Sequence, residues 1–211
     1  MKIIPSINCA DRGCVEKKLD VIKLIQADWI HVDIGEKGFS KISTWDNPEE
    51  FKKLFSELHE KGTRFEVHVM AKNTLERAVK WIGAGADRII VHPELVDISA
   101  LSAIVHEKEI GLAVGPGVPA ENILKYEKYA SFIEVLAVDP GPSGQIFKEE
   151  TIQKIKFLRG RFPSATIEVD GGVTPTVISK IQKAGADIAV SGAYIFESQD
   201  HGLSYLELEK A

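Results

Sequence analysis

Two patterns of hydrophobic residues alternate along the chain, one typical of buried strands and one typical of amphipathic helices. Runs of β-branched and aliphatic residues predict eight strands, at 2–7, 29–34, 64–69, 87–91, 110–114, 131–136, 165–169 and 187–190. Between them, segments such as 47–62 and 148–162 place apolar residues three and four positions apart, as amphipathic helices do. Glycine follows several of these helical segments, at Gly62, Gly85 and Gly185, where it can cap a helix end.

The alternation of strand and helix contains a near-repeat. GAGADRIIV at 83–91 resembles KAGADIAVS at 183–191, and each is predicted to be a helix end, a glycine cap and a strand. Eight strand–helix units predict a closed (β/α)8 TIM barrel, formed as a single domain by residues 1–211. An open doubly wound sheet is the alternative, but no G-x-G-x-x-G follows the first strand.

Composition and charge narrow the classes of partner. The 211 residues are 44% hydrophobic with a net charge of −5, which is typical of a globular domain and argues against nucleic acid or an anionic membrane. No apolar run has the length of a membrane span, and the N-terminal one is too short for a signal peptide. Cys9 and Cys14 match neither a redox nor a zinc motif, so we expect reduced cysteines and a cytoplasmic location.

Polar residues occupy the ends of three predicted strands. Because the site of a TIM barrel lies at the C-terminal ends of its strands, and side chains alternate between faces, His31 and Asp33 are predicted to point inward. The same parity turns His68 and Met70 inward on the third strand and Asp170 on the seventh. Each residue alone could be a hydrogen-bonded rim residue, but together two imidazoles and two carboxylates suit a divalent cation.

Glycine-rich loops follow the last three strands. They are DPGPSGQ at 139–145, DGGV at 170–173 and SGAYIF at 191–196. Loops in these positions of a TIM barrel often hold a phosphate on backbone N–H groups. A single loop of this kind would be read as a tight turn, but three beside a metal-like cluster favour a small phosphorylated substrate.

These motifs together resemble the ribulose-phosphate 3-epimerase family. The resemblance runs from Pro5 to about Phe196 and rests on PSI, HVD, VHVM, VHPE, P-G-x-x-G-Q, VDGG and the closing IF. It implies a TIM barrel of the ribulose-phosphate-binding type. It also implies metal ligation by His31, Asp33, His68 and Asp170, with Asp33 and Asp170 as the acid/base pair. The implied substrate-binding residues are Ser6, His68, Met70, Gly141, Pro142, Ser143, Gly144, Gly171, Gly172, Gly192 and Ala193.

The resemblance implies an isomerase of carbohydrate metabolism, in the pentose phosphate pathway. It would interconvert D-ribulose 5-phosphate and D-xylulose 5-phosphate through a 2,3-enediolate, with two carboxylates moving the C3 proton. One divalent ion would support the reaction, with Zn²⁺ as the first choice and Fe²⁺, Mn²⁺ or Co²⁺ as alternatives. The partner is then a small phosphorylated sugar, and a homo-oligomer is expected because members of the family often self-associate.

The chain departs from the family pattern around the substrate. Gly35 and Glu36 replace Met and Asp, LAV at 136–138 replaces M-S-V, and Pro142 and Ser143 change the phosphate loop. A hexulose or tetrulose phosphate is therefore an alternative substrate, and a non-catalytic phosphosugar-binding relative is a further alternative. A decarboxylase or synthase on the same barrel would need a lysine at a strand end, and the predicted strand ends carry none.

The remaining polar residues have structural interpretations. His92 is either a structural histidine or a substrate contact, and Trp45 either covers the site or packs ahead of the next helix. Glu66, Arg88 and Glu168 are expected to form a buried charge network near the barrel floor. The other histidines are expected to be solvated: His59, His106 and His201.

Overall fold

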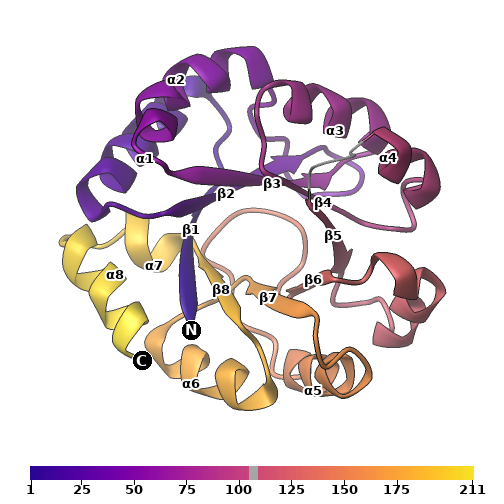
Figure 1. Ribbon diagram of the computed structural model, residues 1–211. Helices are drawn as coiled ribbons and strands as arrows, with labels where there is room; N and C mark the ends of the chain where they lie inside the picture. Colours follow the sequence, from indigo (N-terminus) through magenta and orange to yellow (C-terminus); the bar gives the residue numbers. More distant parts are fainter. Residues whose placement is uncertain (105–108) are drawn as a thin grey trace.

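Eight parallel strands close into a barrel whose outside is covered by helices (Figure 1). The computed structural model describes residues 1–104 and 109–211, so His106 lies outside the described residues. The strands follow one another around the barrel in chain order, and β1 pairs with β8 to close it. The predicted (β/α)8 barrel is therefore confirmed, and the closure excludes the open doubly wound sheet.

The strands agree with the predicted ones to within one residue at each end, and the helices predicted within 47–62 and 148–162 lie inside those segments. The strands are β1 Lys2–Ile7, β2 Trp29–Gly35, β3 Arg64–Met70, β4 Arg88–Val91, β5 Glu109–Val114, β6 Phe132–Leu136, β7 Thr166–Asp170 and β8 Ile188–Ser191. The helices are α1 Arg12–Ile25, α2 Pro48–Glu60, α3 Thr74–Gly83, α4 Ile98–Ile104, α5 Thr151–Arg161, α6 Pro175–Ala184, α7 Ala193–Phe196 and α8 His201–Lys210, with the 3₁₀ helix η1 at Ala120–Tyr129.

Capping residues fix where the helices begin and end. The Asn47 side chain accepts a hydrogen bond from the Glu50 N–H at 3.2 Å, so α2 begins at the Asn-Pro step that predicted it. Gly62, Gly85 and Gly185 all have positive φ angles, which glycine adopts without strain. These three caps turn the chain back toward the next strand.

Two apolar layers surround the sheet. The larger one fills the space between strands and helices and contains Ile30, Val32, Phe65 and Val67. The smaller one lies inside the barrel and includes Ile4, Met70, Ile90, Ala113, Phe132, Leu136, Ile188 and Val190. The predicted parity of β2 and β3 is thus confirmed, because their aliphatic faces contact the helices and Met70 points inward.

Cys9 and Cys14 form a disulfide, so the expectation of reduced cysteines is wrong. The loop after β1 turns directly into α1, where Asp11 caps the helix by accepting a hydrogen bond from the Cys14 N–H at 2.9 Å. This turn brings the two Cα atoms to 5.6 Å, within the usual range for a disulfide. The spacing of two cysteines in sequence does not reveal such a turn.

Among the described helices, none has both the length and the apolar composition that crossing a bilayer requires.

Candidate active site

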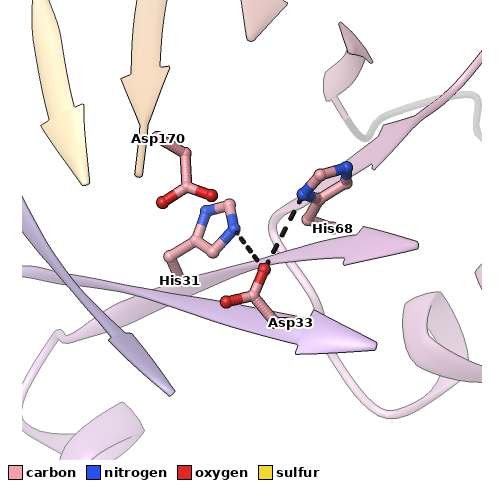
Figure 2. A group of neighbouring side chains, drawn as sticks. All are labelled: His31, Asp33, His68 and Asp170. Atoms are coloured by element: carbon pink, nitrogen blue, oxygen red, sulfur yellow. Dashed lines mark hydrogen bonds and ion pairs between the residues drawn. The ribbon is translucent and has the colours of Figure 1, made fainter. Parts of the chain in front are cut away.

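Four side chains meet at the mouth of the barrel. His31 and Asp33 lie on β2, His68 on β3 and Asp170 at the end of β7 (Figure 2). The parallel register pairs Asp33 with His68 on neighbouring strands, and one ligand atom from each of the four residues lies within 4.8 Å of the others. The structure therefore brings together all four residues that the sequence nominated as metal ligands.

Asp33 is at the centre of this cluster. Its Oδ1 lies 3.3 Å from Nε2 of His31 and 3.7 Å from Nδ1 of His68 (Figure 2). Its other oxygen, Oδ2, accepts a hydrogen bond of 2.8 Å from the hydroxyl of Ser6, on β1. Ser6 therefore orients the carboxylate so that one oxygen faces both imidazoles.

The pKa values of the two carboxyls are shifted in opposite directions. Burial, followed by the negative charge of Asp33, raises the pKa of Asp170 to about 8. Burial also acts to raise the pKa of Asp33, but the charge and hydrogen bond of His31 outweigh it and hold that pKa below its ordinary value. Two carboxylates this close do not both carry charge without a positive partner.

The rings of His31 and His68 are oriented by contacts on their nitrogens that face away from Asp33. Nδ1 of His31 lies 2.8 Å from Glu66, and Nε2 of His68 lies 3.1 Å from Nε2 of His92. These contacts leave Nε2 of His31 and Nδ1 of His68 facing the centre of the cluster. Burial lowers the pKa of His92, which favours its neutral form.

A buried charge network lies below the cluster, as expected. Arg88 pairs with Glu66, and Glu66 in turn contacts His31. Burial and the charge of Glu66 raise the pKa of Glu168 well above its ordinary value. The network therefore supports His31 from the barrel floor.

The sequence interpretation missed Glu134, which lies on β6 between these two levels. It is fully buried, and its carboxylate lies 3.0 Å from Nδ1 of His68. The signal was present, because Glu134 alternates with Phe132 and Leu136 in FIEVL and both of these point into the barrel.

The donor set fits a divalent metal ion. Two imidazoles and two carboxylates are ligands that zinc, iron and manganese accept. Nδ1 of His68 is buried between two carboxylates, at 3.0 Å from Glu134 and 3.7 Å from Asp33, a position in which a cation would also be held. His31, Asp33, His68 and Asp170 are the residues that would hold such an ion.

A cavity of about 580 Å³ opens directly above the cluster. Asp33 and Asp170 line its floor. All but one of the predicted substrate-binding residues line it as well: Ser6, Met70, Gly141, Pro142, Ser143, Gly144, Gly171, Gly172, Gly192 and Ala193. The exception is His68, which lies behind Asp33. His92 is also absent from the lining, so its contact with His68 favours the structural interpretation.

Glycine is required where the loop after β7 crosses the loop after β6. Gly172 has a φ of +66°, and a Cβ there would lie 2.4 Å from the backbone nitrogen of Phe147. A Cβ on Gly171 would lie 2.4 Å from the side chain of Val138. These close approaches exclude a side chain at either position, so bare backbone of both glycines lines the cavity.

The loop that departs from the family pattern folds over the mouth. Thr44 donates a hydrogen bond to the Asp33 carbonyl at 2.8 Å, and the ring of Phe39 packs edge-on against His92, with 4.6 Å between centroids. Trp45 packs against the helical core and does not line the cavity, so it is a packing residue and not a cover.

Comparison with known proteins supports the motifs. The sequence model of the ribulose-phosphate 3 epimerase family matches residues 2–196. A ribulose-phosphate 3-epimerase of Schizosaccharomyces pombe is 29% identical, with 94% of this chain and 88% of the relative covered. The cytoplasmic isoform of Oryza sativa is 30% identical, with 100% and 93% covered.

Solved structures establish the fold alone, since their sequence identities are low. A 3-hexulose-6-phosphate synthase superposes with a TM-score of 0.72 at 19% identity, covering 100% of this chain and 99% of the other. KGPDC from Streptococcus mutans in complex with D-R5P gives a TM-score of 0.72 at 12% identity, covering 99% and 95%. The family resemblance drawn from the motifs is confirmed by the sequence matches, and the barrel by these structures.

Proposed function

Because the chain belongs to the ribulose-phosphate 3-epimerase family, we propose that it interconverts D-ribulose 5-phosphate and D-xylulose 5-phosphate. The observation that carries the proposal is the placement of Asp33 and Asp170 together on the floor of the cavity, below three glycine-rich loops. Inversion at C3 of a 2-ketose needs one group to remove the proton and another to return a proton to the opposite face.

The two carboxylates can perform these steps. They rise from β2 and β7, which are not neighbours in the barrel, so they reach the substrate from different directions. One removes the C3 proton to give a 2,3-enediolate, and the other donates a proton to the opposite face; their roles exchange in the reverse reaction. Ser6, which donates to Asp33 at 2.8 Å, keeps that carboxylate aimed at the cavity.

His31, Asp33, His68 and Asp170 would hold a divalent ion, with Zn²⁺ as the first choice and Fe²⁺, Mn²⁺ or Co²⁺ as alternatives. When bound, such an ion supplies a Lewis acid that stabilises negative charge on the substrate oxygens. The exposed N–H groups around Gly172 and Gly192 would bind the phosphate.

Altered residues at the cavity wall keep a second substrate class open. Ser143 is one of them, and its hydroxyl lies 3.4 Å from where a Cβ on Gly192 would be, so it faces the glycine loops. A tetrulose or hexulose phosphate is therefore the alternative substrate. A non-catalytic role is less well supported, because both acid/base carboxylates and both histidines are present.

The test is proton exchange at C3. The metal-loaded protein is incubated with D-ribulose 5-phosphate in D₂O, and deuterium at C3 is followed by NMR, with Asp170→Asn as the control. Exchange with formation of xylulose 5-phosphate is expected, and both should be lost in the variant. Absence of exchange in protein that holds metal would reject the pentulose substrate, and the same assay with tetrulose and hexulose phosphates would then test the alternative.

A further inference from the structure

Glu134 is a buried carboxylate without hydrogen-bonding compensation. It is the central residue of β6 and is 0% exposed. Neither Oε1 nor Oε2 accepts a hydrogen bond from any residue that the structure describes. A buried carboxylate in this state is costly unless a cation lies next to it.

The neighbours of Glu134 are the two nitrogens that face the metal cluster. Its Oε1 lies 3.0 Å from Nδ1 of His68, and its Oε2 lies 3.8 Å from Nε2 of His31. The 3.0 Å contact falls outside hydrogen-bond geometry and is an ion pair when His68 is protonated. A metal ion in place of that proton would have the nitrogen and the carboxylate oxygen as adjacent ligands.

Glu168 provides an internal comparison. It lies directly opposite Glu134 in the register of β6 and β7 and is equally buried. Its carboxylate, however, lies 3.8 Å from Nδ1 of His31, the nitrogen turned away from the cluster. Of this matched pair, only Glu134 faces the atoms that converge on Asp33.

We propose that Glu134 is a fifth protein donor to the metal ion, binding from the barrel-floor side of the four-residue cluster. This inference rests on the proposed metal-dependent function and adds a residue to it. The set then contains three carboxylates and two imidazoles, more donors than the four of a tetrahedral zinc site. Its charge and donor number suit ions that accept five or six ligands, so this set favours Mn²⁺, Fe²⁺ or Co²⁺ over the Zn²⁺ that the four-residue cluster alone would favour.

Cobalt(II) is the probe, because its visible absorption is intense when four ligands are bound and weak when six are. The full chain and its Glu134→Leu variant are loaded with Co²⁺, and affinity is measured by competition with a chelator. We expect affinity to fall more than 100-fold, beyond the 10–100-fold typical of a residue that only supports a ligand, and absorption to intensify as a ligand is lost.

Two further variants complete the design. Glu134→Gln keeps the shape of the side chain and replaces Glu134→Leu if the latter does not fold, although leucine is often tolerated in place of a buried charge. Glu168→Gln is the matched control and should change affinity less than fivefold, with the spectrum unaltered.

An unchanged Co²⁺ spectrum in a folded Glu134 variant would overturn the inference, whatever its affinity. If the wild-type protein still exchanges C3 deuterium in that case, the proposed function stands without it. A wild-type protein that binds no Co²⁺ would reject both the inference and the metal dependence.

Discussion

The two halves of the barrel mouth are built in different ways. The side-chain half, formed by His31, Asp33 and His68, presents atoms that are fixed by strand register and held from behind by Ser6, Glu66 and His92. The glycine half, formed by residues 141–144, 171–172 and 192, presents backbone on loops. Asp170 lies where the two halves meet.

The difference shows how each half can vary. A side-chain ligand cannot be exchanged without losing its donor atom, so the side-chain half tolerates little change. Backbone N–H groups are supplied by every residue except proline, so the glycine half can accept new side chains where space allows. Accordingly, Ser143 departs from the family pattern and keeps its N–H, while Pro142 departs from it with the loss of one N–H. His31, Asp33 and His68 do not depart from it.

The largest expected effect comes from the side-chain half. Asp33→Asn should lower the rate of epimerisation about 10²–10⁴-fold, because it removes a proton-transferring carboxylate. Competitive inhibition by inorganic phosphate, which the glycine half would bind, should remain. Asp20→Asn, the same change on an exposed position of α1, should have no effect. A rate above one tenth of wild type would contradict the acid/base role.

Gly172→Ala tests the glycine half. Strain at positive φ and the clash with Phe147 should lower the free energy of unfolding by about 2 kcal/mol. The KM should rise more than about 10-fold as the loop moves, a loss of at least about 1.4 kcal/mol in binding, while metal affinity is retained. Gly38→Ala is the control, since Gly38 also has a positive φ but no atom lies near its Cβ position. An unchanged KM would show that this loop does not bind the substrate.

The segment after β1 joins the halves, and Asn8 is its contact with the glycine half. Its side-chain amide donates a hydrogen bond to the Gly141 carbonyl at 3.0 Å. Asn8→Ala should raise KM about fivefold, as the loss of about 1 kcal/mol predicts, with kcat nearly unchanged. Asn122→Ala, at an exposed position of η1, is the control. A fall in kcat with constant KM would contradict this prediction and would show that Asn8 acts through the side-chain half instead.

The smallest effect on turnover is expected from Lys18, whose Nζ donates to the Ser6 carbonyl at 3.1 Å. Burial lowers the pKa of Lys18 to about 8, below its ordinary 10.5. Between these values the unfolded chain holds a proton that the folded chain has lost. The free energy of unfolding should therefore rise with pH from about 8 to 10.5 because of this group.

Lys18→Met should flatten that rise in the pH dependence of stability. Chemical denaturation of wild type and variant at pH 8 and pH 10 measures it. A wild-type stability that falls over this range relative to the variant would show that Lys18 is not buried as described.

The sequence predicted correctly those features that depend on the alternation of side chains along a strand. The alternation in WIHVDIG and RFEVHVM placed His31, Asp33 and His68 inside the barrel, and the structure agrees. The barrel itself followed from eight alternating units. Both predictions depend on the periods of two residues in strands and 3.6 residues in helices, which are visible in the spacing of hydrophobic residues.

The alternation of side chains along a strand could not predict contacts that depend on loop geometry. It also gave little weight to a single polar residue in an apolar strand. The Cys9–Cys14 disulfide requires the turn at Asp11, and the contact of Asn8 with Gly141 joins residues far apart in sequence. Glu134 was passed over because its neighbours in FIEVL are apolar. Its importance emerges only from the nitrogens that surround it in three dimensions.

The pairing of β1 with β8 has a consequence for the order in which this protein matures. On the ribosome, Ser6 emerges well before Asp170 and Gly192. Until β8 arrives, β1 keeps an unpaired edge of the kind that promotes association between chains. The site at the barrel mouth is therefore complete only after β8 has emerged, and a nascent chain released before β8 would carry His31 and His68 without a closed barrel around them.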